Sequence, residues 1–182
     1  IQPPVIAYAT WRVYQQTKNR AWLESMYSGL VRWHTYLLRE RQLPGRALYG
    51  IVNPDESGED NSPRFDAALG LPPQHDVKDN RDKRFLLFDV HKSYDYLANG
   101  GTHQHFWVED VPFNVFAIAS LEAMAAIATE LKTNDAGLFK SAAHETARAM
   151  RTHCLLDGSF WSAQGPGQPL VMVNTWARFA PL

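Results

Sequence analysis

Residues 56–66 of this chain read Glu56-Ser57-Gly58-Glu59-Asp60-Asn61-Ser62-Pro63-Arg64-Phe65-Asp66. The segment holds four acidic side chains and one arginine between two stretches with a helical pattern. Gly58 and Pro63 disfavour a regular helix, so we expect a loop. Loops on a rigid scaffold often carry binding or catalytic residues, but charged clusters also occur on ordinary solvated surfaces. The segment alone leaves both interpretations open.

The composition is typical of a folded domain or of part of one. Of the 182 residues, 45% are hydrophobic, and 18 basic side chains nearly balance 19 acidic ones. This balance does not favour a nucleic-acid partner or a membrane surface, and we expect no apolar run near the ~20 residues of a membrane span. Cys154 is the only cysteine, so neither an intrachain disulfide nor a cysteine-based metal site is expected.

The sequence begins at Ile1 without a methionine and ends soon after an apolar segment. We interpret residues 1–182 as a fragment of a single larger catalytic domain, whose remainder would be its main partner. We expect a cytoplasmic protein, although a signal peptide ahead of Ile1 would lie outside this sequence. Because such a fragment leaves apolar faces uncovered, we expect it to be poorly soluble or oligomeric when expressed alone.

Apolar residues recur at helical spacing in two pairs of segments. The pattern predicts helices near 4–16 and 20–41, and again near 111–132 and 135–153. Pro3-Pro4 suits a first helical turn. Short polar turns join the members of each pair, so each pair should form an antiparallel hairpin. Apolar residues nearly surround the third helix, which indicates burial on several sides.

The remaining segments are less regular. Residues 42–84 contain few hydrophobic residues and are expected to form a long loop, which is uncommon in a compact domain unless it is functional. A helix is expected at 85–97, ended by Gly100-Gly101, and a loop at 165–167. Another apolar element should begin within 170–179. We expect no sheet of more than two strands.

Helical hairpins with long loops fit either an α/α toroid or an irregular α-solenoid, and periodicity does not choose between them. The acidic segment resembles the E-S-G-x-D-N-S-P-R-[WF]-D stretch of family 63 glycoside hydrolases. That family includes the processing α-glucosidases and the mannosylglycerate hydrolases. Further segments resemble the same family, namely Gln2-Pro3-Pro4, Leu48-Tyr49-Gly50-Ile51-Val52, Val108-Glu109-Asp110-Val111-Pro112-Phe113-Asn114 and Leu156-Asp157-Gly158-Ser159-Phe160-Trp161.

The resemblance implies an all-α fold that forms part of an (α/α)6 toroid. It also implies hydrolysis of an α-glycosidic bond with inversion, on an oligosaccharide or small glycoside, with no cofactor and no catalytic metal. The mannosylglycerate branch carries an R-P-T segment ahead of a tyrosine. This chain has Asp89–Tyr94 in its place, which does not favour a glycerate substrate.

Inverting hydrolysis needs a carboxylic acid that protonates the leaving oxygen and a second carboxylate that activates water. Carried over from the family, the acid is Asp60. Glu56 and Glu59 would raise the pKa of Asp60 through like charge, as a proton donor requires. The family's base lies beyond a position corresponding to Leu182, and no residue here matches it. We therefore expect half of the catalytic pair in this chain.

Three polar residues of the segment, Glu56, Asn61 and Arg64, are candidate sugar ligands. Arg64 should bind sugar hydroxyls or hold Asp66 in place. Each could equally serve only to hold the loop.

Aromatic side chains often stack on sugars, and the candidates are Tyr8, Trp11, Tyr49, Trp107 and Trp161. We take Tyr8, Trp11 and Trp107 as substrate-binding candidates, although aromatic residues at helical spacing are more often core. Trp22 and Trp33 are assigned to the core.

Two further groups of polar residues could suggest a metal site or a catalytic role, but each has a simpler explanation. His103-Gln104-His105 near Glu109 lacks a third metal ligand at a clear spacing, so no metal site is predicted. Glu109 and Asp110 open a helix, where the helix dipole favours acidic side chains without any catalytic duty. The alternative to a glycosidase is a non-catalytic helical-repeat scaffold that binds a protein partner through its acidic loop.

Overall fold

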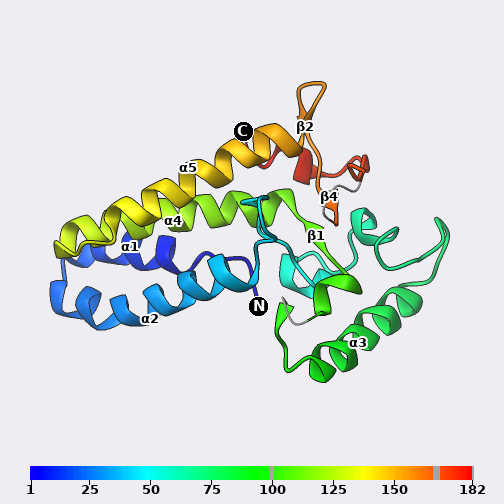
Figure 1. The fold of residues 1–182 in the computed structure, drawn as a ribbon, viewed down its shortest axis with the longest axis horizontal. Helices are drawn as coiled ribbons and strands as arrows, with labels where there is room; N and C mark the ends of the chain where they lie inside the picture. The colour runs from blue at the N-terminus through cyan, green and yellow to red at the C-terminus, as the bar shows by residue number, and fades with distance from the viewer. Residues whose placement is uncertain (99–100, 166–168, 182) are drawn as a thin grey trace.

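The computed structural model describes residues 1–98, 101–165 and 169–181. Its five α-helices are α1 (Ile6–Thr17), α2 (Arg20–Glu40), α3 (Val77–Ser93), α4 (Val111–Leu131) and α5 (Ala136–His153). Helices α1, α2, α4 and α5 lie side by side in one half, and α3 lies with the loops in the other (Figure 1). Both expected hairpins, α1–α2 and α4–α5, are confirmed.

The strands are short and form two separate antiparallel pairs. Strand β1 (Val108–Glu109) pairs with β4 (Ala163–Gln164), and β2 (Leu155–Leu156) pairs with β3 (Ser159–Phe160). No sheet in the described residues has more than two strands, as expected. Ile51 also bridges to Val108, so the chain leading into the acidic loop lies against β1, which leads into α4.

Helix α4 forms the centre of the helical half, where it contacts α1, α2 and α5. Its buried side chains include Phe113, Leu121, Met124 and Ile127, in agreement with the apolar pattern on several sides. By length and composition alone, α4 is the one helix of the described residues that could cross a membrane, which the sequence analysis did not anticipate. Within this fold, 61% of its most apolar window is buried against other elements.

His34 joins α2 to α4 in this core. Its Nδ1 lies 2.8 Å from the Leu30 carbonyl oxygen, and its Nε2 lies 2.9 Å from Ser120 Oγ. In the neutral tautomer Nδ1–H donates to the carbonyl and Nε2 accepts from the hydroxyl. The side chain is 2% exposed, and this burial lowers the pKa of His34.

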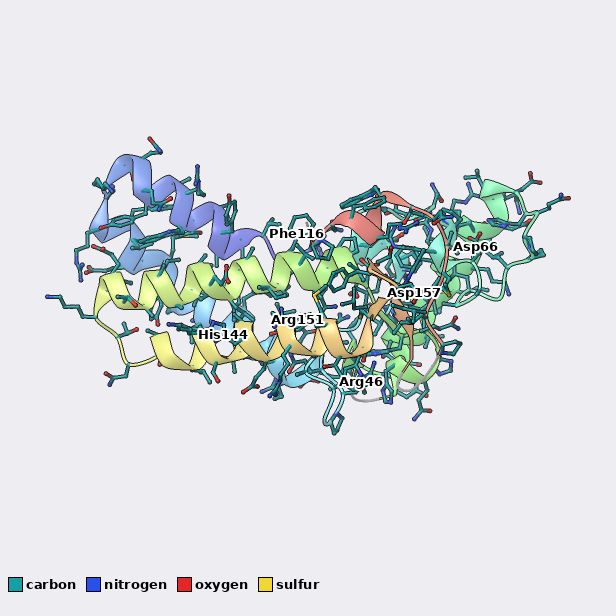
Figure 2. The ribbon with its side chains drawn as sticks, turned by 90° about the horizontal axis from the view of Figure 1, so that it is seen from above. Arg46, Asp66, Phe116, His144, Arg151 and Asp157 are labelled. Carbon is teal, nitrogen blue, oxygen red and sulfur yellow. The ribbon has the colours of Figure 1, made fainter. Side chains whose placement is uncertain are left out.

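The lowered pKa of His34 predicts acid sensitivity. Around and below pH ~6.5, His34 is protonated more readily in the unfolded chain than in the folded chain. The free energy of unfolding should therefore fall as the pH falls. Thermal melts between pH 8 and 5 should show this loss, and His34→Gln should weaken it. His144→Gln, at an exposed position of α5 (Figure 2), should leave it unchanged. Equal pH profiles for wild type and His34→Gln would contradict the assignment.

Several boundaries differ from the sequence predictions. Helix α1 begins at Ile6 with Val5 as its N-cap, so Pro3 and Pro4 precede the helix instead of forming its first turn. Helix α3 begins at Val77, not near residue 85, which shortens the long loop expected at 42–84. A capping box starts α3: Asp76 and Asp79 each accept a hydrogen bond from the other's backbone N–H.

Helix α3 also ends earlier than predicted, at Ser93, so the glycine pair is not its end. Gly100 of that pair lies outside the described residues, as do Pro166 and Gly167 of the loop expected at 165–167. The apolar element expected at 170–179 is only a bridge at Leu170 and one short 3-10 helix, η5 (Trp176–Phe179).

Candidate active site

The acidic segment is folded around two short 3-10 turns, η1 (Pro54–Ser57) and η2 (Pro63–Phe65). Asn53 caps η1, its Oδ1 accepting from the Asp55 N–H at 3.0 Å. Gly58 has a φ of +75°, a left-handed conformation that favours glycine. The segment is thus an ordered loop without an α-helix, as its glycine and proline predict.

A buried ion pair fixes the first end of the loop. The Glu56 oxygens accept from Arg41 Nη1 and Nη2 at 2.7 and 2.8 Å, and Glu56 Oε2 also accepts from the Val52 N–H at 3.0 Å. The Glu56 and Arg41 side chains are only 7% and 4% exposed. Burial opposes the charged carboxylate, but Arg41 and the Val52 N–H outweigh it and lower the pKa of Glu56. In this chain Glu56 therefore holds the loop, and its predicted contact with sugar remains untested.

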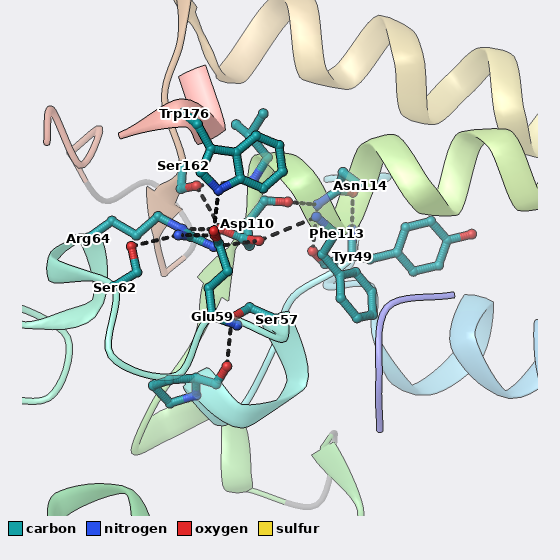
Figure 3. Close-up of polar contacts among 12 residues, drawn as sticks. Tyr49, Ser57, Glu59, Ser62, Arg64, Asp110, Phe113, Asn114, Ser162 and Trp176 are labelled. Atoms are coloured by element: carbon teal, nitrogen blue, oxygen red, sulfur yellow. Dashed lines mark hydrogen bonds and ion pairs between the residues drawn. The ribbon is translucent and has the colours of Figure 1, made fainter. Parts of the chain in front are cut away.

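A second buried network fixes the other end. Arg64 Nε donates to Asp110 Oδ1 at 2.9 Å, and Arg64 Nη1 donates to Ser62 Oγ at 2.6 Å (Figure 3). Asp110, which is fully buried, also accepts from Ser162 Oγ at 3.1 Å and from the Phe113 N–H at 3.3 Å. Asp110 is thus the N-cap of α4, in line with its predicted place at a helix start, and it also anchors the loop.

Arg64 does not hold Asp66 as the sequence analysis suggested. The partner of Asp66 is His75, whose Nε2 lies 3.6 Å from Asp66 Oδ1. Burial raises the pKa of Asp66, and a protonated His75 would act against that rise. Asp66 is therefore a carboxyl of the loop with the raised pKa that a proton donor needs.

Asp60 is the most accessible carboxylate of the loop. Its side chain is 44% exposed, against 29% for Glu59 and 18% for Asp66. Its Oδ2 lies 3.5 Å from Nη1 of Arg84, a residue of α3 that is 7% exposed and also pairs with Asp55. Neighbouring Asn61 is exposed as well.

The electrostatic surroundings of Asp60 differ from the prediction. Glu56 and Glu59 were expected to act on Asp60 as like charges. Instead, Glu56 is neutralised by Arg41 and Glu59 faces Arg64, while the nearest cation to Asp60 is Arg84. The difference arises because three arginines converge on the loop, and two of them come from outside it.

Trp176 is a residue of this site that the sequence analysis missed. Its indole Nε1 donates to Glu59 Oε1, although 117 positions separate the two residues (Figure 3). It lies in a stretch that was expected to be merely apolar, and no local pattern distinguishes it from a core tryptophan.

The predicted aromatic platforms lie elsewhere. Tyr8 and Trp11 line a cavity of about 270 Å³ between α1 and α4. Trp107 is 3% exposed, packs over Gly50, and lines another cavity of about 340 Å³ that also includes Ala68. Residues 56–66 line neither of these two cavities. The structure therefore does not bring Tyr8 and Trp11 to the loop that holds Asp60.

No metal cluster is formed by the part of the chain that the structure describes, where no three His, Cys, Asp or Glu side chains are placed to share an ion. Glu109 is instead paired with Arg46, whose Nε donates to Glu109 Oε1 at 3.0 Å. His103 Nδ1 lies 3.0 Å from the Ala98 carbonyl oxygen.

Comparison with known proteins decides between a toroid and a solenoid. The model of the mannosylglycerate hydrolase MGH1-like glycoside hydrolase domain matches residues 1–182. The chain belongs to this family of glycoside hydrolases. Membership of this family favours the glycoside hydrolase interpretation over the non-catalytic scaffold.

Two curated relatives illustrate the similarity. A mannosylglycerate hydrolase of Rubrobacter radiotolerans is 44% identical over 73 residues, which cover 38% of this chain and 16% of that protein. A glucosylglycerate hydrolase of Mycolicibacterium hassiacum is 26% identical over 213 aligned positions, which cover 100% of this chain and 48% of the relative.

Solved structures establish the fold of this chain. The family 63 mannosylglycerate hydrolase of Thermus thermophilus in complex with Tris superposes with a TM-score of 0.88 at 23% identity. The match covers 99% of this chain and 49% of that one, so the chain spans about half the length of the solved relative. The helical hairpins are part of an (α/α)6 toroid, as the sequence resemblance implied.

Proposed function

We propose that the full-length protein hydrolyses an α-glycosidic bond with inversion, with Asp60 as the proton donor. The base that activates water would come from outside residues 1–182. The observation that carries the proposal is the contrast within the loop: Glu56 and Arg64 are buried in ion pairs, whereas the Asp60 carboxyl is 44% exposed. Buried anchors on both sides of an accessible carboxyl provide the fixed position that proton transfer requires.

Arg84 is placed to act on the Asp60 carboxyl. When Asp60 gives its proton to the leaving oxygen, it becomes a carboxylate 3.5 Å from the Arg84 guanidinium. A charge-assisted contact of this kind is strongest when the carboxylate is ionised, so Arg84 would stabilise the anion that the proton transfer leaves, while it also favours the ionised form of Asp60 before the transfer. Arg84 is itself held in place, because its Nε donates to Asn80 Oδ1 at 2.8 Å.

We propose a small α-glycoside as the substrate, and glycosylglycerates are the first to test. The curated relatives are named mannosylglycerate and glucosylglycerate hydrolases, and the solved Thermus relative carries D-glycerate in one complex and glucose in another. The Asp89–Tyr94 segment argued against glycerate on sequence grounds, so neutral α-glucosides and α-mannosides belong in the same assay.

The test is hydrolysis by the full-length protein of mannosylglycerate, glucosylglycerate and neutral α-disaccharides, followed by proton NMR. We expect turnover of at least one substrate, with the β-anomer of the released sugar appearing first. An α-anomer formed first would mean retention, and no turnover of any substrate would refute the proposed function.

A further inference from the structure

We propose that Trp176 stacks against a sugar ring of the substrate and so forms a sugar subsite at the loop that carries Asp60. This inference rests on the proposed function and names a specific aromatic residue for it. It starts from the hydrogen bond that the Trp176 ring donates to the acidic loop.

The exposure of Trp176 sets it apart. The chain has six tryptophans, and the other five are buried or partly buried, whereas Trp176 is 51% exposed. An exposed indole has a large apolar face open to a ligand, and its loss of conformational freedom on binding is small.

The short helix that carries Trp176 is held in place from both sides. Ala177 is buried, and η5 contacts β3 and α4. The guanidinium of Arg178 lies over the rings of Trp161 and Phe179, at 4.8 and 5.0 Å from their centroids. Arg178 Nη2 also donates to Ser159 Oγ at 2.6 Å. These contacts therefore fix the short helix from which the exposed Trp176 ring projects.

The orientation of the ring is fixed by the loop. Trp176 Nε1 donates to Glu59 Oε1, and the Glu59 carboxylate also faces Arg64, which is buried against Asp110. Figure 3 shows the indole beside Glu59, Arg64 and Asp110. Glu59 directly precedes Asp60, so Trp176 contacts the same loop that carries the proposed proton donor.

The surrounding chemistry favours a sugar. A pyranose has an apolar C–H face that suits an indole face and a rim of hydroxyl groups that need hydrogen-bond partners. Glu59 contacts Trp176, and Asp60 and Asn61 follow it in the same loop, so these three residues are the candidate partners; all three are at least partly exposed. A ligand site typically combines an apolar surface with a few convergent polar groups in this way.

The test uses three variants of the full-length protein. Trp176→Ala removes the ring, and Trp176→Phe keeps a smaller face but loses the bond to Glu59. Phe85→Ala, which removes an aromatic side chain that is 54% exposed on α3, is the matched control. With the best glycoside, Trp176→Ala should raise KM about fivefold to thirtyfold, the range that ~1–2 kcal/mol corresponds to, with little change in kcat. Trp176→Phe should have a smaller effect, and Phe85→Ala should stay within about twofold of wild type.

Calorimetric titration with D-glucose and D-mannose provides a second readout that does not depend on catalysis. Trp176→Ala should weaken binding in step with KM. If Trp176→Ala lowers the melting temperature but leaves KM and sugar binding unchanged, the residue packs against another part of the protein and the inference is overturned. If the wild-type protein hydrolyses no glycoside, the proposed function fails, but the titration still tests the Trp176 subsite. Loss of sugar binding in Trp176→Ala would support the subsite. Unchanged binding in Trp176→Ala, or no sugar binding by the wild-type protein, would overturn it.

Discussion

Replacing Asp60 with asparagine in the full-length enzyme should lower kcat for its preferred glycoside by about 10²–10⁴-fold, the usual contribution of general acid catalysis. Asparagine keeps the size and the hydrogen bonds of the side chain but has no proton to transfer. Because the loss falls on the transition state, KM should change little. Steady-state kinetics at several pH values would measure the effect.

The neighbouring carboxyls are the controls for this prediction. We expect smaller losses from Asp66→Asn and Glu59→Gln, because neither carboxyl is as accessible as that of Asp60. Asp66 is the sharper control, since its pKa is raised by burial and would suit a proton donor. If Asp66→Asn loses far more activity than Asp60→Asn, the donor is Asp66 and the carry-over from the family is wrong for this chain.

Replacing Glu56 with glutamine should destabilise the protein by about 3–5 kcal/mol, the usual cost of removing one partner from a buried ion pair. The change leaves the Arg41 guanidinium charged, 4% exposed and without its counter-ion. Denaturant or thermal unfolding of the full-length protein would measure the loss.

The same substitution in an exposed pair is the matched control. Glu24 pairs with Arg20 on the surface of α2, with side chains 54% and 46% exposed, so Glu24→Gln should cost at most ~1 kcal/mol. Where Glu56→Gln is folded, its KM should match that of wild type. Unchanged stability together with a raised KM would mean that Glu56 binds substrate, as the sequence analysis suggested.

The helical hairpins could be predicted from the sequence because the residue patterns that define them lie within each helix and the turn beside it. Apolar residues at helical spacing and short polar turns define α1, α2, α4 and α5 within a residue or two. Helix α3 has no such stripe, since Phe85, Leu86 and Phe88 are exposed. Its start depends on the capping box at Asp76, which a search for apolar periodicity does not detect.

The candidate site could be predicted only in part. The composition of residues 56–66 pointed to the loop and, with the family resemblance, to Asp60. The residues that hold the loop were not visible, because Arg41, Asp110 and Trp176 contact it across 15, 46 and 117 positions. Pairings at such separations follow from the tertiary fold and leave no local pattern in the sequence.

A glycosyl fluoride separates proton donation by Asp60 from a role in shaping the loop, since fluoride leaves without being protonated. Turnover of the α-fluoride of the preferred sugar should therefore be compared with turnover of the natural glycoside in wild type and Asp60→Asn. If Asp60 is the donor, the glycoside loses about 10²–10⁴-fold and the fluoride far less. Equal losses on the two substrates, or near-normal turnover of the glycoside, would contradict the assignment.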